Sequence, residues 1–140
     1  MASPGYLKAR GEPKTMEAIA AHDTIQFGAT AGMADWRFVE DGREVRVAIA
    51  PRLSTNSADA AVQYAEQGGG LTRVLAYQAA GAIKHGRVKV VLAKFELPAL
   101  PIHIVYPTSR LLSAKVRTFI DLVTEMTDWL IKRLLYNQKQ

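Results

Sequence analysis

Strand-like alternation of apolar and polar side chains is clearest around the Asp41-Gly42 pair. Apolar runs at residues 36–39 and 44–49 flank this pair, and an Asp-Gly turn between two such runs predicts a β-hairpin. The second run alternates with polar or small side chains, which predicts one buried face made by Val45, Val47 and Ile49. Four further strands are predicted at residues 24–28, 53–55, 71–75 and 88–92.

Helix-start and helix-stop residues separate these strands. Asn56 or Ser57 is a suitable cap for a helix that runs through Gln67 and ends at the glycines 68–70, since a left-handed C-terminal cap favours glycine. The inward positions of this helix are Ala61, Val62 and Ala65. A weaker helix is predicted at residues 76–84.

Two short helices are predicted near the start of the chain. Ser3-Pro4 opens the first, which stops at Gly11, and Thr15 caps the second, with Ile19 on its apolar side. Strands that alternate with helices in this order predict an α/β fold with a mixed, largely parallel sheet and flanking helices.

The stretch from residue 96 to 122 predicts a proline-framed strand and then an amphipathic helix. Prolines at 98, 101 and 107 bracket an apolar run, and proline fits poorly inside a central strand, so it marks the ends of one. Ser113 is a suitable N-cap for the helix. Its apolar stripe has helical spacing and consists of Val116, Phe119, Ile120, Val123, Met126, Leu130 and Leu134.

Composition narrows the class of protein. The chain has 140 residues, of which 49% are hydrophobic and 22% charged, a balance typical of one globular domain. No apolar run reaches the roughly 20 residues of a membrane span, and the first residues lack the apolar core of a signal peptide. The absence of cysteine excludes disulfides and thiolate chemistry. We therefore expect a cytoplasmic protein with no membrane contact.

Charge and candidate catalytic residues favour a binding role. The net charge is +5, but the basic residues are scattered through the chain, whereas a nucleic-acid surface is usually a basic stripe or helix. Serines 54, 57 and 113 and histidines 22, 85 and 103 form no recognisable nucleophile motif, and no two histidines have metal-ligand spacing. We expect no catalytic residue, no metal and no cofactor.

The start of the helix after Thr55-Asn56 is a candidate anion site. Free N–H groups and the helix dipole favour a negative group there, and α/β folds usually place ligands where strands end. Simple helix capping explains the same residues, and local evidence alone favours it over an anion site. The glycines at 68–70 are not a phosphate-binding loop, because no Gly-Lys-Ser/Thr follows them.

Several stretches in order resemble the effector-binding domain of LysR-type transcriptional regulators, over about residues 3 to 124. They are SPGYLKARGEP, AAHDTIQF, the strand before the DGR turn, PRLSTNSADAAVQYAEQGGGLTRVLAYQ, GRVKVVLAKFELPALPIHIVYP and LLSAKVRTFID. The resemblance implies a periplasmic-binding-protein-like sensor of two α/β subdomains with a small, often anionic, organic effector between them. It implies hinge crossings near residues 22–24 and 97–101.

By this resemblance, residues 1–23 form a helical lead-in from a partial first subdomain, and residues 24–96 are the complete second subdomain. Residues 97–140 are the hinge, a returning strand and a terminal helix, the remnant of the first subdomain. The effector-binding residues implied are Phe27, Gly28, Thr55, Asn56, Thr72 and His103. No DNA-binding segment of the family is matched, so the resemblance implies no direct DNA contact by this chain.

We expect a truncated effector-binding domain that senses a small molecule and oligomerises. The strand and helix left without their neighbours would expose apolar surface, which a second copy would cover as a homodimer or higher oligomer. The interface predicted in this way comprises Ile102, Ile104, Tyr106, Phe119, Val123, Trp129 and Leu130. A stand-alone small-molecule-binding module and a small α/β enzyme are the alternatives.

Overall fold

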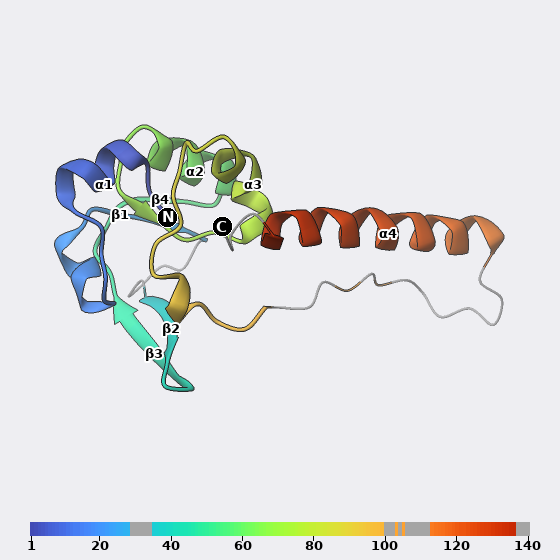
Figure 1. Ribbon diagram of the computed structural model, residues 1–140, viewed down its shortest axis with the longest axis horizontal. Coiled ribbons are helices and arrows are strands. Elements are labelled where there is room, and N and C mark those ends of the chain that lie inside the picture. Colours follow the sequence, from blue (N-terminus) through green and yellow to red (C-terminus); the bar gives the residue numbers. More distant parts are fainter. Residues whose placement is uncertain (29–34, 100–102, 104, 106–112, 137–140) are drawn as a thin grey trace. The chain divides into compact units, whose positions relative to one another are not determined.

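The computed structural model describes residues 1–28, 35–99, 103, 105 and 113–136, with side chains only up to residue 126 in the last segment. The chain divides into two units, Met1–Pro98 and Ala99–Gln140. The first unit contains almost all of the described elements (Figure 1). In chain order these are α1 (Pro4–Arg10), the 3₁₀ turn η1 (Glu17–Ala21), β1 (Thr24–Phe27), β2 (Asp35–Glu40), β3 (Arg43–Ala48), β4 (Pro51–Thr55), α2 (Ala58–Glu66), β5 (Leu71–Thr72), α3 (Ala76–Lys84) and η2 (Ala93–Phe95).

A parallel sheet in the order β4-β1-β5 forms the centre of this unit. Phe27 pairs with Thr55 on one side of β1, and Ile25 pairs with Thr72 on the other. The strands β2 and β3 form a separate antiparallel hairpin. Its turn residues Asp41 and Gly42 both have positive φ, 49° and 75°, as a two-residue hairpin turn requires. The predicted α/β class and the predicted hairpin are confirmed.

Two apolar clusters hold the unit together. In the first, α2 and α3 lie side by side (Figure 1) and pack on β1 through Ile25, Ala61, Val62, Ala65, Ala79, Ala82 and Val88. In the second, α1, η1, the hairpin, β5 and η2 meet through Ala2, Tyr6, Leu7, Met16, Ile19, Trp36, Phe38, Leu71 and Phe95. The small alanines of the first cluster let α2 lie close to the sheet and α3 lie close to α2. The second cluster contains residues from both the predicted lead-in and the predicted second subdomain.

Several predicted boundaries are confirmed by hydrogen bonds. The Ser3 Oγ accepts from the Tyr6 N–H and α1 ends at Gly11. The Ser57 Oγ accepts from the Ala60 N–H, so Ser57 rather than Asn56 caps α2. The helix predicted at residues 76–84 has those bounds.

The predicted strand at residues 88–92 is wrong. Lys89 makes one isolated antiparallel bridge with Ala2, and Leu92 adopts a left-handed conformation (φ 60°) that ends any extended run before η2. The reason is the N-terminus: Met1 exchanges two hydrogen bonds with Thr72 and occupies the outer side of β5. Residues 88–92 therefore have no sheet edge along which to form a ladder.

Three smaller predictions also differ from the structure. The strand predicted at 71–75 stops at Thr72, because Leu75 turns the chain into α3 and its N–H donates to the Gln78 side chain. The second short helix is a five-residue 3₁₀ turn whose N-cap is Met16, not Thr15. The strand predicted as buried at 53–55 is only half-buried, since its pattern alternates between half-buried and exposed side chains.

In the second unit the structure describes one long helix, α4 (Ala114–Tyr136). The Ser113 Oγ accepts from the Val116 N–H at 3.4 Å, which confirms the predicted cap. The predicted strand at residues 102–106 lies outside the described residues except for His103 and Val105, which are exposed and belong to no strand.

Candidate functional site

The carboxyl ends of β1 and β4 bring four predicted site residues together. Phe27 pairs with Thr55, and the Gly28 N–H donates to the Thr55 carbonyl at 3.0 Å, which continues the pairing by one residue. Asn56 follows directly on β4. Gly28 has φ 98°, and an added Cβ would have no atom within 4 Å, so the backbone conformation rather than crowding favours glycine there.

The start of α2 leaves the Asn56 side chain available. The Thr55 Oγ1 accepts from the Ser57 N–H at 3.1 Å, and Ser57 caps the helix. Asn56 is exposed, and no hydrogen bond within the described part of the chain engages its side chain. Asn56 can therefore present an amide donor and acceptor beside the helix start.

The two remaining predicted site residues are Thr72 and His103. Thr72 is only 1% exposed, its Oγ1 donates to the Ile25 carbonyl at 3.2 Å, and its backbone groups both bond Met1. His103 is exposed and belongs to the second unit. The hydroxyl of Thr72 stabilises the sheet, and its predicted role in binding stays a prediction, as does that of His103.

Sequence reasoning missed Arg73, which follows β5 at the same edge of the sheet. Its guanidinium carbon lies 5.9 Å from the centre of the Phe38 ring. Partial burial, together with the like charge of Arg37, lowers the pKa of Arg73, while Glu96 acts in the opposite direction. Its position directly after an apolar strand was the signal that could have found it.

A polar chain of contacts ties the hairpin to the candidate site. The Trp36 Nε1–H donates to the Gln26 Oε1 at 2.9 Å, and the Gln26 Nε2 donates to the Phe27 carbonyl at 3.1 Å. Trp36 is only 5% exposed. This hydrogen-bonded link fixes the hairpin beside the end of β1.

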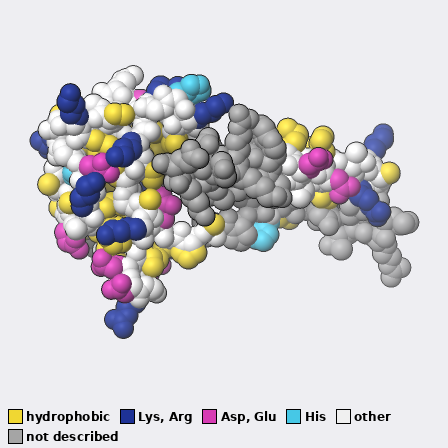
Figure 2. Space-filling view, viewed as in Figure 1, with side chains coloured by type: hydrophobic (Ala, Val, Ile, Leu, Met, Phe, Trp, Pro, Cys, Tyr) yellow, Lys and Arg dark blue, Asp and Glu magenta, His cyan; other side chains and the backbone are white. Residues whose placement is uncertain are grey.

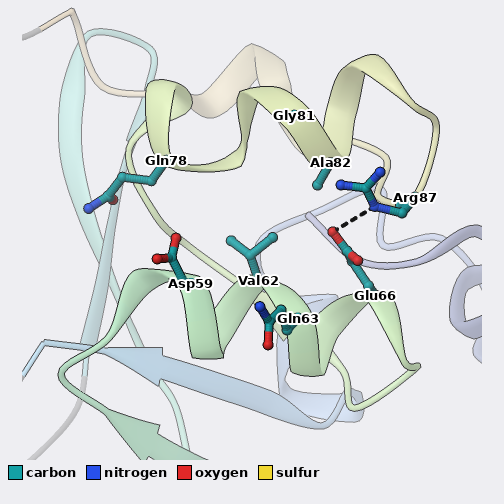
Figure 3. A pocket seen from close by; sticks show the side chains of 8 residues that line it. All are labelled: Asp59, Val62, Gln63, Glu66, Gln78, Gly81, Ala82 and Arg87. Atoms are coloured by element: carbon teal, nitrogen blue, oxygen red, sulfur yellow. Dashed lines mark ion pairs between the residues drawn. The ribbon is translucent and has the colours of Figure 1, made fainter.

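A hollow lies between α2 and α3. It is a shallow groove of about 300 Å³, and Figure 3 shows its lining side chains: Asp59, Val62, Gln63, Glu66, Gln78, Gly81, Ala82 and Arg87. An ion pair between Arg87 and Glu66 at 3.0 Å crosses one end. Because this ion pair satisfies the one cation of the groove, the groove offers weaker recognition for an anion than the strand ends.

Two of the histidines and two of the serines weighed as catalytic candidates make structural contacts. The His22 Nδ1 lies 3.2 Å from the Tyr6 hydroxyl, and partial burial lowers the pKa of His22. The His85 Nδ1 lies 2.8 Å from the Gly81 carbonyl. Ser57 and Ser113 cap helices, so no serine–histidine pair occurs among the described contacts.

Basic and acidic side chains alternate on the surface. On the face that Figure 2 displays, dark-blue Lys and Arg groups of the first unit are spread among acidic groups. Ion pairs such as Arg46–Asp35 and Arg52–Asp23 account for this mixing. Within the described residues there is no group of three metal-ligating side chains, and no helix long and apolar enough to cross a membrane.

Comparison with known proteins decides the family. The family described as "LysR substrate binding domain" matches residues 1–128. The chain belongs to this family. A relative in Escherichia coli K12, the HTH-type transcriptional regulator PgrR, is 35% identical over 122 residues, which are 85% of this chain and 40% of PgrR. The putative LysR family substrate binding domain-containing protein YagP of the same organism is 33% identical over 91 residues, 64% of this chain and 66% of YagP.

Solved structures agree on the LysR fold. The regulatory domain of CrgA, a LysR-type transcriptional regulator from Neisseria meningitidis, superposes with a TM-score of 0.73 at 22% identity and covers 89% of this chain and 61% of that one. The regulatory domain of AphB from Vibrio vulnificus gives 0.64 at 20% identity with the same coverages. The predicted family and its periplasmic-binding-protein-like fold are thus confirmed. The chain spans about 40% of the length of most of the curated regulators that it matches.

Proposed function

We propose that this chain is the effector-sensing part of a LysR-type transcriptional regulator and binds a small organic anion. The site we propose is the carboxyl edge of β1 and β4. The observation that carries the proposal is the hydrogen bond from the Gly28 N–H to the Thr55 carbonyl at 3.0 Å, because it aligns the two strand ends beside Asn56 and the start of α2. Strand ends and helix starts favour anionic ligands.

Binding rather than catalysis is the role we infer for the chain. Its relatives are transcriptional regulators, and His22 and His85 make structural contacts. We infer that the chain itself does not contact DNA, needs no cofactor and acts in the cytoplasm. The hinge positions near residues 22–24 and 97–101 remain part of the proposal, with His103 and Thr72 as further candidate contacts.

A thermal melt in the presence of a panel of small organic acids tests effector binding. A bound ligand raises the melting temperature by mass action, and Asn56→Ala should abolish the shift because it removes an exposed amide at the site. Gln63→Ala is the matched control, since Gln63 is also an exposed amide on the same α2 segment. An equal shift for wild type and Asn56→Ala would place the site elsewhere.

We further propose that a second copy of the chain covers the apolar stripe of α4. Three of its large side chains are exposed: Val116 40%, Phe119 61% and Met126 56%. Val123 is half-buried. The side chains of Trp129 and Leu130, and residues Ile102, Ile104 and Tyr106, lie outside the described residues but remain in the proposed interface.

Size-exclusion chromatography with light scattering tests this interface. The wild-type chain should elute as a dimer or larger oligomer at micromolar concentration, and Phe119→Ser should shift it toward the monomer by removing about 1.5–3 kcal/mol of burial per contact. Arg117→Ser, an exposed neighbour on α4, should leave the oligomer intact. A monomeric wild-type chain would refute the interface.

A further inference from the structure

Arg73 lies at the same edge of the sheet as the proposed effector site, on the other side of β1 from Asn56. It follows β5 directly, and Thr72 pairs with Ile25 of β1. With strands about 4.8 Å apart, β4 and β5 are separated by about 10 Å across β1. One small molecule can therefore reach from the end of β4 to Arg73.

The charge of Arg73 has no acidic partner within 4 Å among the described side chains. In contrast, Arg10, Arg37, Arg46, Arg52 and Arg87 each form an ion pair with Asp or Glu. Glu96 attracts the Arg73 charge, but Arg37 repels it. The Arg73 guanidinium thus keeps its planar donors for another anion, and such a fork suits two-point binding of a carboxylate.

A buried ring holds the Arg73 side chain in place. Phe38 is only 7% exposed, and the guanidinium carbon lies 5.9 Å from its centroid, within the range of a cation–π contact. Phe38 sits on the same hairpin strand as Trp36, which is hydrogen-bonded to Gln26. A restrained arginine loses less conformational entropy when it binds a ligand.

Two large apolar side chains follow Arg73 at the same edge of the sheet. Leu75 is 47% exposed and Tyr77 is 58% exposed, at the point where β5 turns into α3. The first turn of α3 contains no acidic residue, so no negative side chain there competes for the arginine. The positive charge of Arg73 and the exposed apolar side chains of Leu75 and Tyr77 thus lie within five consecutive residues.

We propose that Arg73 is the specificity-determining residue of the effector site: it binds the anionic group of the effector, while Leu75 and Tyr77 contact its apolar part. This assignment rests on the proposed effector-binding function. It makes the effector a small carboxylate with a hydrocarbon or aromatic portion. Neutral isosteres of the same shape bind weakly, because they cannot engage the guanidinium.

Isothermal titration with paired ligands tests the assignment. The probes are phenylacetate, cinnamate and hexanoate, each with its neutral amide. Wild type should prefer at least one carboxylate over its amide by about tenfold or more, the range of a charge-assisted hydrogen bond. Arg73→Gln should lose that preference. Arg43→Gln should retain it, because Arg43 is also exposed and lacks an ion pair among the described side chains.

The outcomes separate this assignment from the proposed function. Carboxylate binding that is lost in Asn56→Ala but kept in Arg73→Gln overturns the role of Arg73 and leaves the effector site standing. No binding of any probe to wild type overturns both. If Arg73→Gln does not fold, Arg73→Lys replaces it, because this variant keeps the charge but loses the planar fork. A several-fold weaker preference for the carboxylate then supports the assignment. An unchanged preference overturns it.

Discussion

Gly70, the last of the three glycines between α2 and β5, should not tolerate even one added carbon. Its φ is +131°, and a Cβ built on it would lie 2.3 Å from the Asp23 carbonyl oxygen and 2.7 Å from the carbon of the same carbonyl. These two nearest atoms are backbone, so no side-chain rotation relieves the contact. The same carbonyl accepts the Leu71 N–H at 2.9 Å, just before β1 begins at Thr24 and pairs with β5.

The expected loss of stability for Gly70→Ala is about 3–5 kcal/mol. A side chain at this φ costs about 1–3 kcal/mol in backbone strain, and moving the carbonyl away breaks a hydrogen bond worth about 0.5–1.5 kcal/mol. The same movement pulls Leu71, which is 1% exposed, out of the core and costs about 1 kcal/mol more. Domains are stable by only about 5–15 kcal/mol, so the variant should be close to unfolding.

Urea denaturation followed by circular dichroism measures this effect. Gly81→Ala is the control: Gly81 is exposed inside α3, and an added Cβ would meet no atom within 4 Å. Alanine is a better helix former than glycine, so this control should gain about 0.5–1 kcal/mol. If Gly70→Ala loses less than 1 kcal/mol, the packing of β5 against β1 described here is incorrect.

Three further changes probe the N-terminal residues and the α2 cap. Tyr6→Phe should lose about 1–2 kcal/mol, because the Tyr6 hydroxyl accepts the Asp23 N–H at 2.9 Å in a half-buried site; chemical denaturation that gives equal stabilities would contradict this. Burial lowers the pKa of the Met1 amine from 8.0 to about 6. The unfolded chain then binds more protons between these values, so where Met1 carries the free amine, stability should rise by about 2 kcal/mol from pH 6 to pH 8. A melting temperature that is flat or falling over this range would refute the buried amine. Ser57→Ala should lose about 1 kcal/mol by removing the α2 cap, measured in the same urea assay, and a loss confined to Asn56→Ala would instead identify residue 56 as the cap.

Local signals in the sequence predicted most of the elements. Ser3 and Ser57 cap helices, Gly11 ends one, and the Asp41-Gly42 pair forms the hairpin turn. Each of these depends on hydrogen bonds or dihedral angles within a few residues. Such features can be recognised without knowing the rest of the fold.

The candidate site was only partly predictable. Phe27 and Gly28 were implied only by the family resemblance, whereas Thr55 and Asn56 were also predicted because α/β folds usually place ligands where strands end. The pairing of Phe27 with Thr55 shows that these residues meet at one edge of the sheet. Arg73 was missed, since its contact with Phe38 joins residues 35 positions apart. The burial of Thr72 was equally hidden, because it depends on Met1.

The sequence by itself determined the family, the α/β class and the strand ends where a ligand is proposed to bind. The tertiary structure alone decided which hydrogen-bonding and charged groups already have a partner within the protein and which remain available to a ligand. Met1 pairs with Thr72 and Ala2 with Lys89, so the N-terminal residues take the sheet edge on which a strand at 88–92 would have formed. Hydrogen bonds along a sheet edge and ion pairs join residues that are far apart in the chain. The partner of each residue therefore depends on its position in the fold.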